Sequence, residues 1–268
     1  MIRALSALAL AVPLLAVEWY APPVVFLWVV LVVACVSGWE FQGLAAAAGW
    51  PARRWDVSLD AGAIVLAAWV GGILPSLVIA LILMRLLARA ATEGDLKTGI
   101  GGAGVYLLGG IWIGGAAALV ALNRALPGGR EAVFFLLLVV WATDIGAYYS
   151  GRLFGKRPLA PALSPGKTVI GAVGGIIASG GVGLALSVWL EIPGVAPALA
   201  VPVAILLSVF AQIGDLCESM VKRAAGAKEA SSLIPGHGGF LDRIDGLLLA
   251  GAPFYYFSYW FAAQLASP

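Results

Sequence analysis

Residues 215–245 read DLCESMVKRAAGAKEASSLIPGHGGFLDRID and lie between two long apolar runs. Acidic and basic side chains crowd this segment, together with His237, the only histidine of a 268-residue chain that is 62% hydrophobic and 11% charged. Ionisable groups beside or inside membrane segments are costly, so they are retained for chemistry or for binding ions. The segment therefore predicts a polar functional site bounded by apolar helices.

The acidic residues of this segment have helical spacing. Positions i, i+3, i+4 and i+7 share one helix face, and here they are Asp215, Glu218, Ser219 and Lys222. Asp242 and Asp245 are likewise three residues apart, at the start of the next apolar run. Carboxylates that converge in this way repel one another unless cations lie between them. We expect Asp215, Asp242 and Asp245 to bind Mg²⁺, with space for a second cation between them.

Basic residues flank these carboxylates: Lys222, Arg223, Lys228 and Arg243. Arginine offers a planar fork and lysine a mobile point charge to phosphate groups. Residues 235–239, Pro-Gly-His-Gly-Gly, predict a tight turn whose glycines allow close approach of the backbone to a ligand. Carboxylates for Mg²⁺ beside cations for phosphate predict a phosphoryl- or nucleotidyl-transfer site.

The composition predicts an all-α, polytopic integral membrane protein. Mean hydropathy is +0.99, and a soluble core is excluded because apolar side chains would cover every face of most helices. Cys35 and Cys217 lie in apolar runs, where we interpret them as small buried residues and not as a disulfide. We expect about nine transmembrane helices, at residues 4–18, 21–38, 58–71, 73–91, 100–122, 132–150, 169–190, 195–221 and 245–266. The first also resembles a signal peptide, but another apolar run follows it, so a retained helix is the better interpretation.

Residues 39–56 are less hydrophobic and contain three tryptophans and two arginines: Trp39, Trp50, Trp55, Arg53 and Arg54. This composition favours an amphipathic segment at the membrane interface, with the tryptophans as anchors rather than as a nucleotide-stacking platform. Residues 1–131 would then form N-terminal helices with an interfacial segment at 39–56. Residues 132–268 would form catalytic helices and cytoplasmic loops, within a single membrane domain, 1–268.

The distribution of basic residues predicts the orientation. If nine helices alternate from a cytoplasmic N-terminus, 14 of the 16 lysines and arginines fall on the cytoplasmic side, and only Arg124 and Arg130 fall on the other. This places the charged segment at the cytoplasmic face of the cytoplasmic (inner) membrane. We expect solvated positions for acids near the outer loops, which are Glu18, Glu131 and Glu191. Asp60, within the third predicted helix, has no partner evident from the sequence.

A second segment, residues 144–156, ends the sixth predicted helix. Asp144, Tyr148 and Arg152 are spaced at i, i+4 and i+8, so they form one stripe along that helix. An intramembrane carboxylate marks either a functional site or a buried ion pair, and here the pair would join Asp144 to Arg152 or Lys156. The segment continues into Leu-Ser-Pro-Gly-Lys-Thr, residues 163–168.

The first segment resembles the signature of the phosphatidate cytidylyltransferases, also called CDP-diacylglycerol synthases. The matching residues are Ser219-x-x-Lys222-Arg223-x4-Lys228-Glu229 and His237-Gly238-Gly239-Phe240-x-Asp242-Arg243-Ile244-Asp245. The family usually has aspartate where this chain has Glu229, so Glu229 is not assigned to the metal. The second segment matches the family's Asp-x-x-Ala-Tyr-x-x-Gly-Arg-x-Phe-Gly-Lys pattern in full, whereas in the following loop Gly166 replaces a lysine and Ile170 a glutamate.

The resemblance implies Mg²⁺-dependent cytidylyl transfer from CTP to phosphatidate, which yields CDP-diacylglycerol and pyrophosphate in phospholipid biosynthesis. The catalytic residues would be Asp215, Asp242, Asp245 and Lys222. The substrate-binding residues would be Arg223, Lys228, Arg243, His237, Ser219, Asp144, Tyr148 and Lys167. The partners would be CTP, phosphatidate and the lipid bilayer, without nucleic acid. A homodimer is compatible with a membrane enzyme of this size, although no residue argues for one.

Other interpretations remain open at this point. A transporter or channel also has intramembrane carboxylates, but here the polar residues cluster on one side. A CDP-alcohol phosphotransferase or a lipid kinase would have different acidic spacing, and the Asp-Gly-x-x-Ala-Arg pattern of the former is absent. Asp215 is alternatively a structural carboxylate, Asp242 and Asp245 are alternatively charges at a helix N-terminus, and His237 is either an acid–base catalyst or part of a phosphate-contacting turn.

Overall fold

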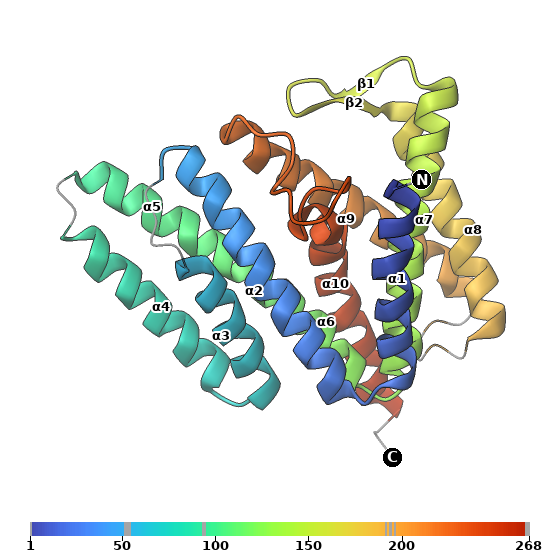
Figure 1. The fold of residues 1–268 in the computed structure, drawn as a ribbon. Helices are drawn as coiled ribbons and strands as arrows, with labels where there is room; N and C mark the ends of the chain where they lie inside the picture. Colours follow the sequence, from blue (N-terminus) through green and yellow to red (C-terminus); the bar gives the residue numbers. More distant parts are fainter. Residues whose placement is uncertain are drawn as a thin grey trace. The chain divides into compact units, whose positions relative to one another are not determined.

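The computed structural model describes residues 2–265 apart from 51–54, 93–94, 191, 193–194 and 196. These residues are almost wholly helical (Figure 1), which confirms the all-α prediction apart from one short hairpin. The helices are α1 (Ile2–Tyr20), α2 (Pro23–Ala47), α3 (Asp56–Val70), α4 (Leu74–Ala90), α5 (Leu96–Gly109), the π-helical η1 (Gly110–Gly115), α6 (Ala116–Ala125), α7 (Gly129–Phe154), α8 (Val169–Trp189), α9 (Pro197–Ala224) and α10 (Leu241–Leu265).

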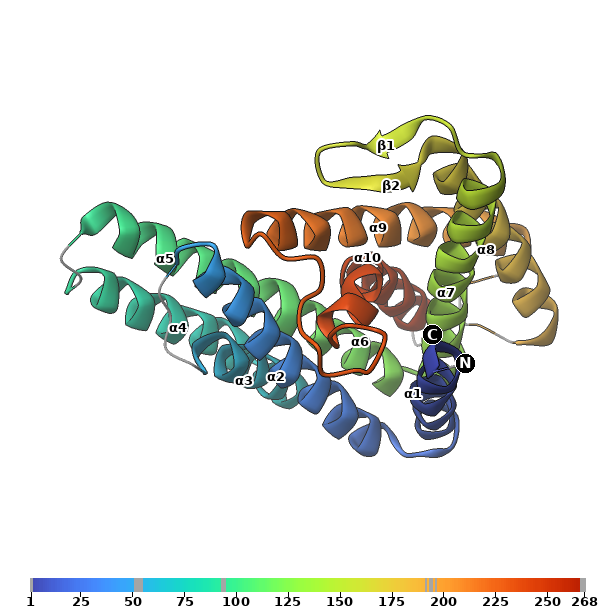
Figure 2. The same cartoon turned by 45° about the horizontal axis from the view of Figure 1, so that its top comes forward.

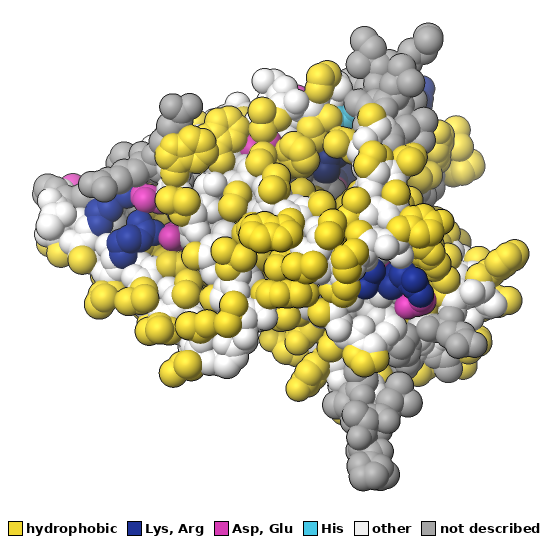
Figure 3. Space-filling model, turned by 60° about the horizontal axis from the view of Figure 1, so that its bottom comes forward, with side chains coloured by type: hydrophobic (Ala, Val, Ile, Leu, Met, Phe, Trp, Pro, Cys, Tyr) yellow, Lys and Arg dark blue, Asp and Glu magenta, His cyan; other side chains and the backbone are white. Residues whose placement is uncertain are grey.

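Each of the nine predicted segments coincides with a helix in the described part of the chain, since α5, η1 and α6 run on as one. Among the described residues, five helical segments are long and apolar enough to cross a membrane: Pro23–Ala47, Leu96–Ala125, Gly129–Phe154, Val169–Trp189 and Pro197–Ala224. Hydrophobic side chains are also spread widely over the face shown in Figure 3. The protein is therefore a polytopic membrane protein.

The predicted end of the second helix at residue 38 is wrong, because α2 continues to Ala47. Phe41 is 1% exposed and Leu44 is buried, so this last part of α2 contributes to the core. Gly38 allows close packing on α3, because a Cβ there would lie 2.9 Å from the carbonyl oxygen of Val57. Arg53 and Arg54 lie outside the described residues, and the interfacial location of 39–56 stays a prediction.

The chain divides into two compact units, each built from separate stretches. The first unit comprises Met1–Pro13, Val24–Leu122 and Val221–Arg243. Its helices α2, α3, α4 and α5 lie side by side (Figure 1), with α3 packed on both α4 and η1. Hydrogen bonds join α2 to α3, from Ser58 Oγ to the carbonyl of Cys35 at 2.7 Å and from the amide of Val57 to Gln42 Oε1 at 2.9 Å.

The second unit comprises Leu14–Pro23, Asn123–Met220 and Ile244–Pro268. Its closest helix pair is α7 and α8, which pack through glycines. A Cβ on Gly175 would lie 2.8 Å from the carbonyl oxygen of Thr143, and one on Gly146 would lie 2.8 Å from that of Gly174. Small residues thus permit backbone contact between these helices. Phe135 of α7 stacks on Phe254 of α10, with ring centroids 5.9 Å apart.

A β-hairpin connects α7 to α8 in the second unit. Its strands, β1 (Pro158–Ala160) and β2 (Ser164–Thr168), pair antiparallel and extend from the ends of the two helices (Figure 2). Thr168 ends β2 and caps α8, since its hydroxyl accepts from the amide of Gly171 at 3.0 Å. The hairpin therefore has a fixed attachment to α8.

Two acidic residues differ from their predicted environments. Glu18, expected in solvent, is 0% exposed and lies 3.4 Å from Arg124, whose guanidinium also donates to the carbonyls of Glu18 and Ala21 at the end of α1. Asp60, for which no partner was evident, forms an ion pair with Arg85 at 2.6 Å. In both cases the partner lies on another helix of the same unit, and burial of a carboxylate requires such a partner.

The glycine packing between α7 and α8 predicts opposite effects for two matched substitutions on α8. Gly175→Ala should destabilise the protein by about 1–3 kcal/mol, because its methyl group would overlap the backbone of α7. Gly181→Ala should have no cost and should stabilise by up to about 1 kcal/mol, because no described atom lies within 4 Å of the added Cβ. Thermal unfolding in detergent measures both, and equal melting temperatures would contradict this packing.

Candidate functional site

Three carboxylates converge in the second unit. Asp215 and Glu218 lie on α9 and Asp245 on α10, with one ligand oxygen from each within 4.8 Å of the others. Gly214 allows this approach, because a Cβ there would come within 2.5 Å of the carbonyl oxygen of Asp245. Glu218 is 0% exposed, while Asp215 and Asp245 are partly accessible. We name these three residues the acidic triad.

Further charged groups lie beside the triad. Lys167, on strand β2 of the hairpin, forms an ion pair with Asp215. Asp144, on α7, lies close enough to act electrostatically on Asp245, as Asp215 and Glu218 do. Like charges this close repel one another unless cations lie between them. Clustered carboxylate oxygens are hard ligands that suit Mg²⁺, so the donor set fits the metal that the sequence implies.

Asp242 lies in the first unit and has different partners. Lys222 Nζ donates to its Oδ1 at 2.6 Å, and the backbone amides of Ala230 and Gly239 each donate to its Oδ2 at 2.8 Å. Burial acts to raise the pKa of Asp242, but the hydrogen bonds from Lys222, Gly239 and Ala230 outweigh it and lower that pKa. Asp242 is therefore an ionised carboxylate that closes the loop between α9 and α10.

The structure thus brings together some of the predicted residues. Asp215, Asp245, Lys167 and Asp144 gather in the second unit, and Lys222 and Asp242 pair in the first. Glu218 was placed on the acidic face by its spacing but was not assigned to the metal. The metal role predicted for Asp242 stays a prediction, since its oxygens accept three hydrogen bonds from the protein.

The other predicted substrate-binding residues lie on the same helices and loops. Ser219 is buried on α9, and Tyr148 accepts a hydrogen bond from Arg152 at 2.9 Å on α7. Arg223 donates to the carbonyl of Ala227 at 3.1 Å. Lys228 and Arg243 have exposed side chains. His237 lies in a tight turn, where Gly236 and Gly238 adopt φ values of 76° and 74°, as predicted from the glycines.

Glu40 was not recognised as a site residue from the sequence. It is 2% exposed on α2, and its carboxylate accepts hydrogen bonds from the backbone amides of Phe240 and Leu241. The sequence could have pointed to Glu40, because it is a lone acidic residue in an apolar helix. Membrane segments retain such a residue only when it has a partner.

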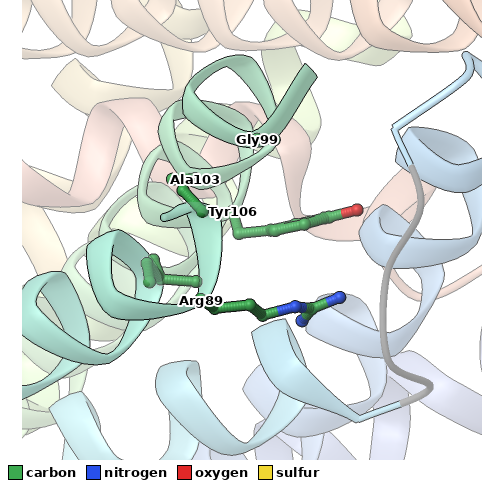
Figure 4. A pocket seen from close by; sticks show the side chains of 7 residues that line it. Arg89, Gly99, Ala103 and Tyr106 are labelled. Carbon is green, nitrogen blue, oxygen red and sulfur yellow. The ribbon is translucent and has the colours of Figure 1, made fainter. Parts of the chain in front are cut away.

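A separate pocket lies in the first unit between α4 and α5. Its lining is Leu86, Arg89, Ala90, Gly99, Gly102, Ala103 and Tyr106. Arg89 and Tyr106 extend side by side in the same direction (Figure 4). Arg89 forms an ion pair with Asp56, and the hydroxyl of Tyr106 donates to the carbonyl of Trp50 at 2.5 Å. The polar groups of this pocket thus bind protein partners, and we assign it no ligand.

Residues 1–261 match the sequence profile of the cytidylyltransferase family. The phosphatidate cytidylyltransferase of Brucella suis biovar 1 (strain 1330) is 49% identical over 148 residues, which are 55% of this chain and 54% of that protein. The protein of the same name from Haemophilus influenzae (strain ATCC 51907 / DSM 11121 / KW20 / Rd) is 44% identical over 140 residues, which are 50% of this chain and 47% of that protein. The one from Bacillus subtilis (strain 168) is 41% identical over 132 residues, which are 48% of this chain and 47% of that protein. The matched part spans about half the length of these relatives.

The acidic triad predicts binding of a divalent cation in the absence of any substrate. Mg²⁺ should raise the melting temperature of the detergent-purified protein. Asp245→Asn should raise the Mg²⁺ concentration needed for this effect by about tenfold or more, because the substitution removes one charged ligand. Asp95→Asn is the matched control, since Asp95 is an exposed cap at the start of α5. Equal Mg²⁺ dependence in the two variants would rule out the triad as the cation site.

Proposed function

Because the chain belongs to the cytidylyltransferase family, we propose that it transfers the cytidylyl group of CTP to phosphatidate, in phospholipid biosynthesis. The observation that carries this proposal is the acidic triad beside Lys167, at helices of a membrane protein. The names of the similar proteins support phosphatidate as the lipid substrate. The products would be CDP-diacylglycerol and pyrophosphate.

The reaction makes few demands on acid–base chemistry. A phosphate oxygen of phosphatidate attacks the α-phosphorus of CTP, the bond from that phosphorus to the bridging oxygen of the β-phosphate breaks, and pyrophosphate leaves with the electron pair. The attacking oxygen is already anionic, so no side chain has to remove a proton from it. The protein must instead neutralise charge and hold two polyanions in line.

The acidic triad supplies the ligands for this task. Asp215, Glu218 and Asp245 would hold Mg²⁺, which when bound would offset phosphate charge and orient the reacting groups. Asp144 lies near enough to act electrostatically on Asp245, and it would help to hold a second cation. Glu218 takes the place that the sequence alone suggested for Asp242, which we propose acts by holding Lys222.

Basic and hydroxyl side chains would bind the phosphates and the nucleotide. Lys222 and Arg223 follow Glu218 by about one turn of α9, and Asp242 holds the Lys222 ammonium in place. Lysine and arginine in such positions attract the triphosphate and stabilise departing pyrophosphate. The proposed substrate-binding residues are Lys167, Lys222, Arg223, Lys228, Arg243, His237, Ser219, Tyr148 and Asp144.

We further propose that about nine helices span the cytoplasmic membrane with the N-terminus inside. The excess of lysine and arginine on one side supports this orientation, and it would let CTP reach the site from the cytoplasm. A homodimer stays a prediction without a structural argument.

The proposed reaction predicts the fate of a label. With CTP labelled at its α-phosphorus, phosphatidate and Mg²⁺, the protein should move the label into the lipid extract, whereas a label at the γ-phosphorus should appear in pyrophosphate. Asp245→Asn should reduce this transfer by at least about 100-fold, because it removes charge where the polyanions meet, and Asp95→Asn should retain it. Label transfer that is equally fast in Asp245→Asn would remove the triad from the reaction.

The proposed orientation predicts accessibility to an impermeant thiol reagent. In a variant without Cys35 and Cys217, a cysteine at the exposed Ser232 should react in inverted vesicles, and one at the exposed Pro127 should react in right-side-out vesicles. The reverse pattern, or reaction of both cysteines from one side, would show that the assigned orientation is wrong.

A further inference from the structure

Glu40 of α2 contacts a loop that lies 200 residues away in the sequence. Its Oε1 accepts from the hydroxyl of Ser231 at 2.6 Å and from the amide of Phe240 at 3.0 Å, and its Oε2 accepts from the amide of Leu241 at 2.7 Å. The side chain is 2% exposed. Both oxygens of a buried carboxylate are thus satisfied by donors from one segment of the first unit.

These contacts hold the amides at the start of helix α10. The first amides of a helix lack partners within the helix, and a serine, threonine or aspartate before the first residue usually supplies one. Phe240 precedes Leu241 here and its side chain cannot accept a hydrogen bond. Glu40 instead accepts from the amides of Phe240 and Leu241, while Asp242 accepts from that of Gly239. Two carboxylates therefore hold three successive amides.

The chain is shaped to admit the Glu40 carboxylate. A Cβ on Gly239 would lie 2.3 Å from Glu40 Oε1 and 2.7 Å from Oε2, so no larger residue fits there with the carboxylate in place. Gly238, with its φ of 74°, turns the chain just before this point. The use of a distant residue fixes the loop to α2 as well.

The segment held in this way carries residues with proposed roles. It includes Lys228 and His237, and it leads directly into Asp242, which holds Lys222. Asp245 of the acidic triad follows Asp242 by about one turn on α10. Small displacements of such groups are costly, because in-line transfer depends on their placement.

We propose that Glu40 is a positioning residue for the transfer reaction, acting by anchoring the loop from Lys228 to Asp242 and the first turn of α10. The expected effect on kcat rests on the proposed function, because it assumes the transfer reaction. Glu40 itself binds no substrate in this account. Its effect passes through the backbone amides of Phe240 and Leu241 to the residues that follow.

The test compares Glu40→Gln with Glu18→Gln in the full-length protein in detergent. Glu18 is an equally buried carboxylate, paired with Arg124, that has no proposed role in the reaction. Glu40→Gln should speed hydrogen exchange in residues 229–241, because an amide offers one acceptor oxygen in place of two. It should also lower kcat by about 10- to 100-fold with a smaller change in KM for CTP. Glu18→Gln should alter neither.

A milder variant covers the case in which Glu40→Gln does not fold. Ser231→Ala removes one donor and leaves both backbone amides on Glu40, so it should change exchange and kcat in the same direction by less. Unchanged exchange in 229–241, or faster exchange with an unchanged kcat, would overturn the proposal. If the wild-type protein forms no CDP-diacylglycerol, the proposed function fails, and the exchange comparison separately shows whether Glu40 anchors the loop.

Discussion

Three carboxylates within 4.8 Å of one another are the constraint on which the rest of this structure depends. Unscreened acids at this separation repel strongly where water is scarce. The protein nevertheless brings them together, because Gly214 lets the backbones of α9 and α10 approach closely. The Lys167 ammonium offsets part of the charge. Hard carboxylate oxygens gathered in this way are suited to bind a divalent cation.

The loop between α9 and α10 illustrates a second use of acidic residues. Buried backbone amides need hydrogen-bond partners, because an unpaired buried amide is costly. Glu40 and Asp242 provide those partners at the start of α10, and Asp242 also holds Lys222. Some carboxylates of this protein are therefore suited to bind metal, and others bind the chain itself. Both groups of carboxylates help to hold charged side chains in fixed positions near the ends of α9 and α10.

The sequence predicts the helices well, because runs of apolar residues long enough to cross a membrane have few alternatives. It also predicts that Asp215 and Asp245 lie among converging carboxylates, because both belong to acidic stretches on either side of one turn, and the structure brings them together with Glu218. It does not reveal pairs formed between distant segments, such as Asp60 with Arg85 or Glu40 with Leu241, because spacing along one helix carries no information about its neighbours. The short hairpin from Pro158 to Thr168 was missed because its strands have three and five residues and little alternation.

The most direct test of the central claim is to locate the bound cation. Mn²⁺ has chemistry close to that of Mg²⁺ and gives an anomalous signal in diffraction from crystals soaked with it. The account predicts an anomalous peak about 2.1 Å from carboxylate oxygens of Asp215, Glu218 and Asp245, absent in Asp245→Asn. A peak on Asp242 with none at the triad, or no peak on any of these carboxylates, would contradict the account.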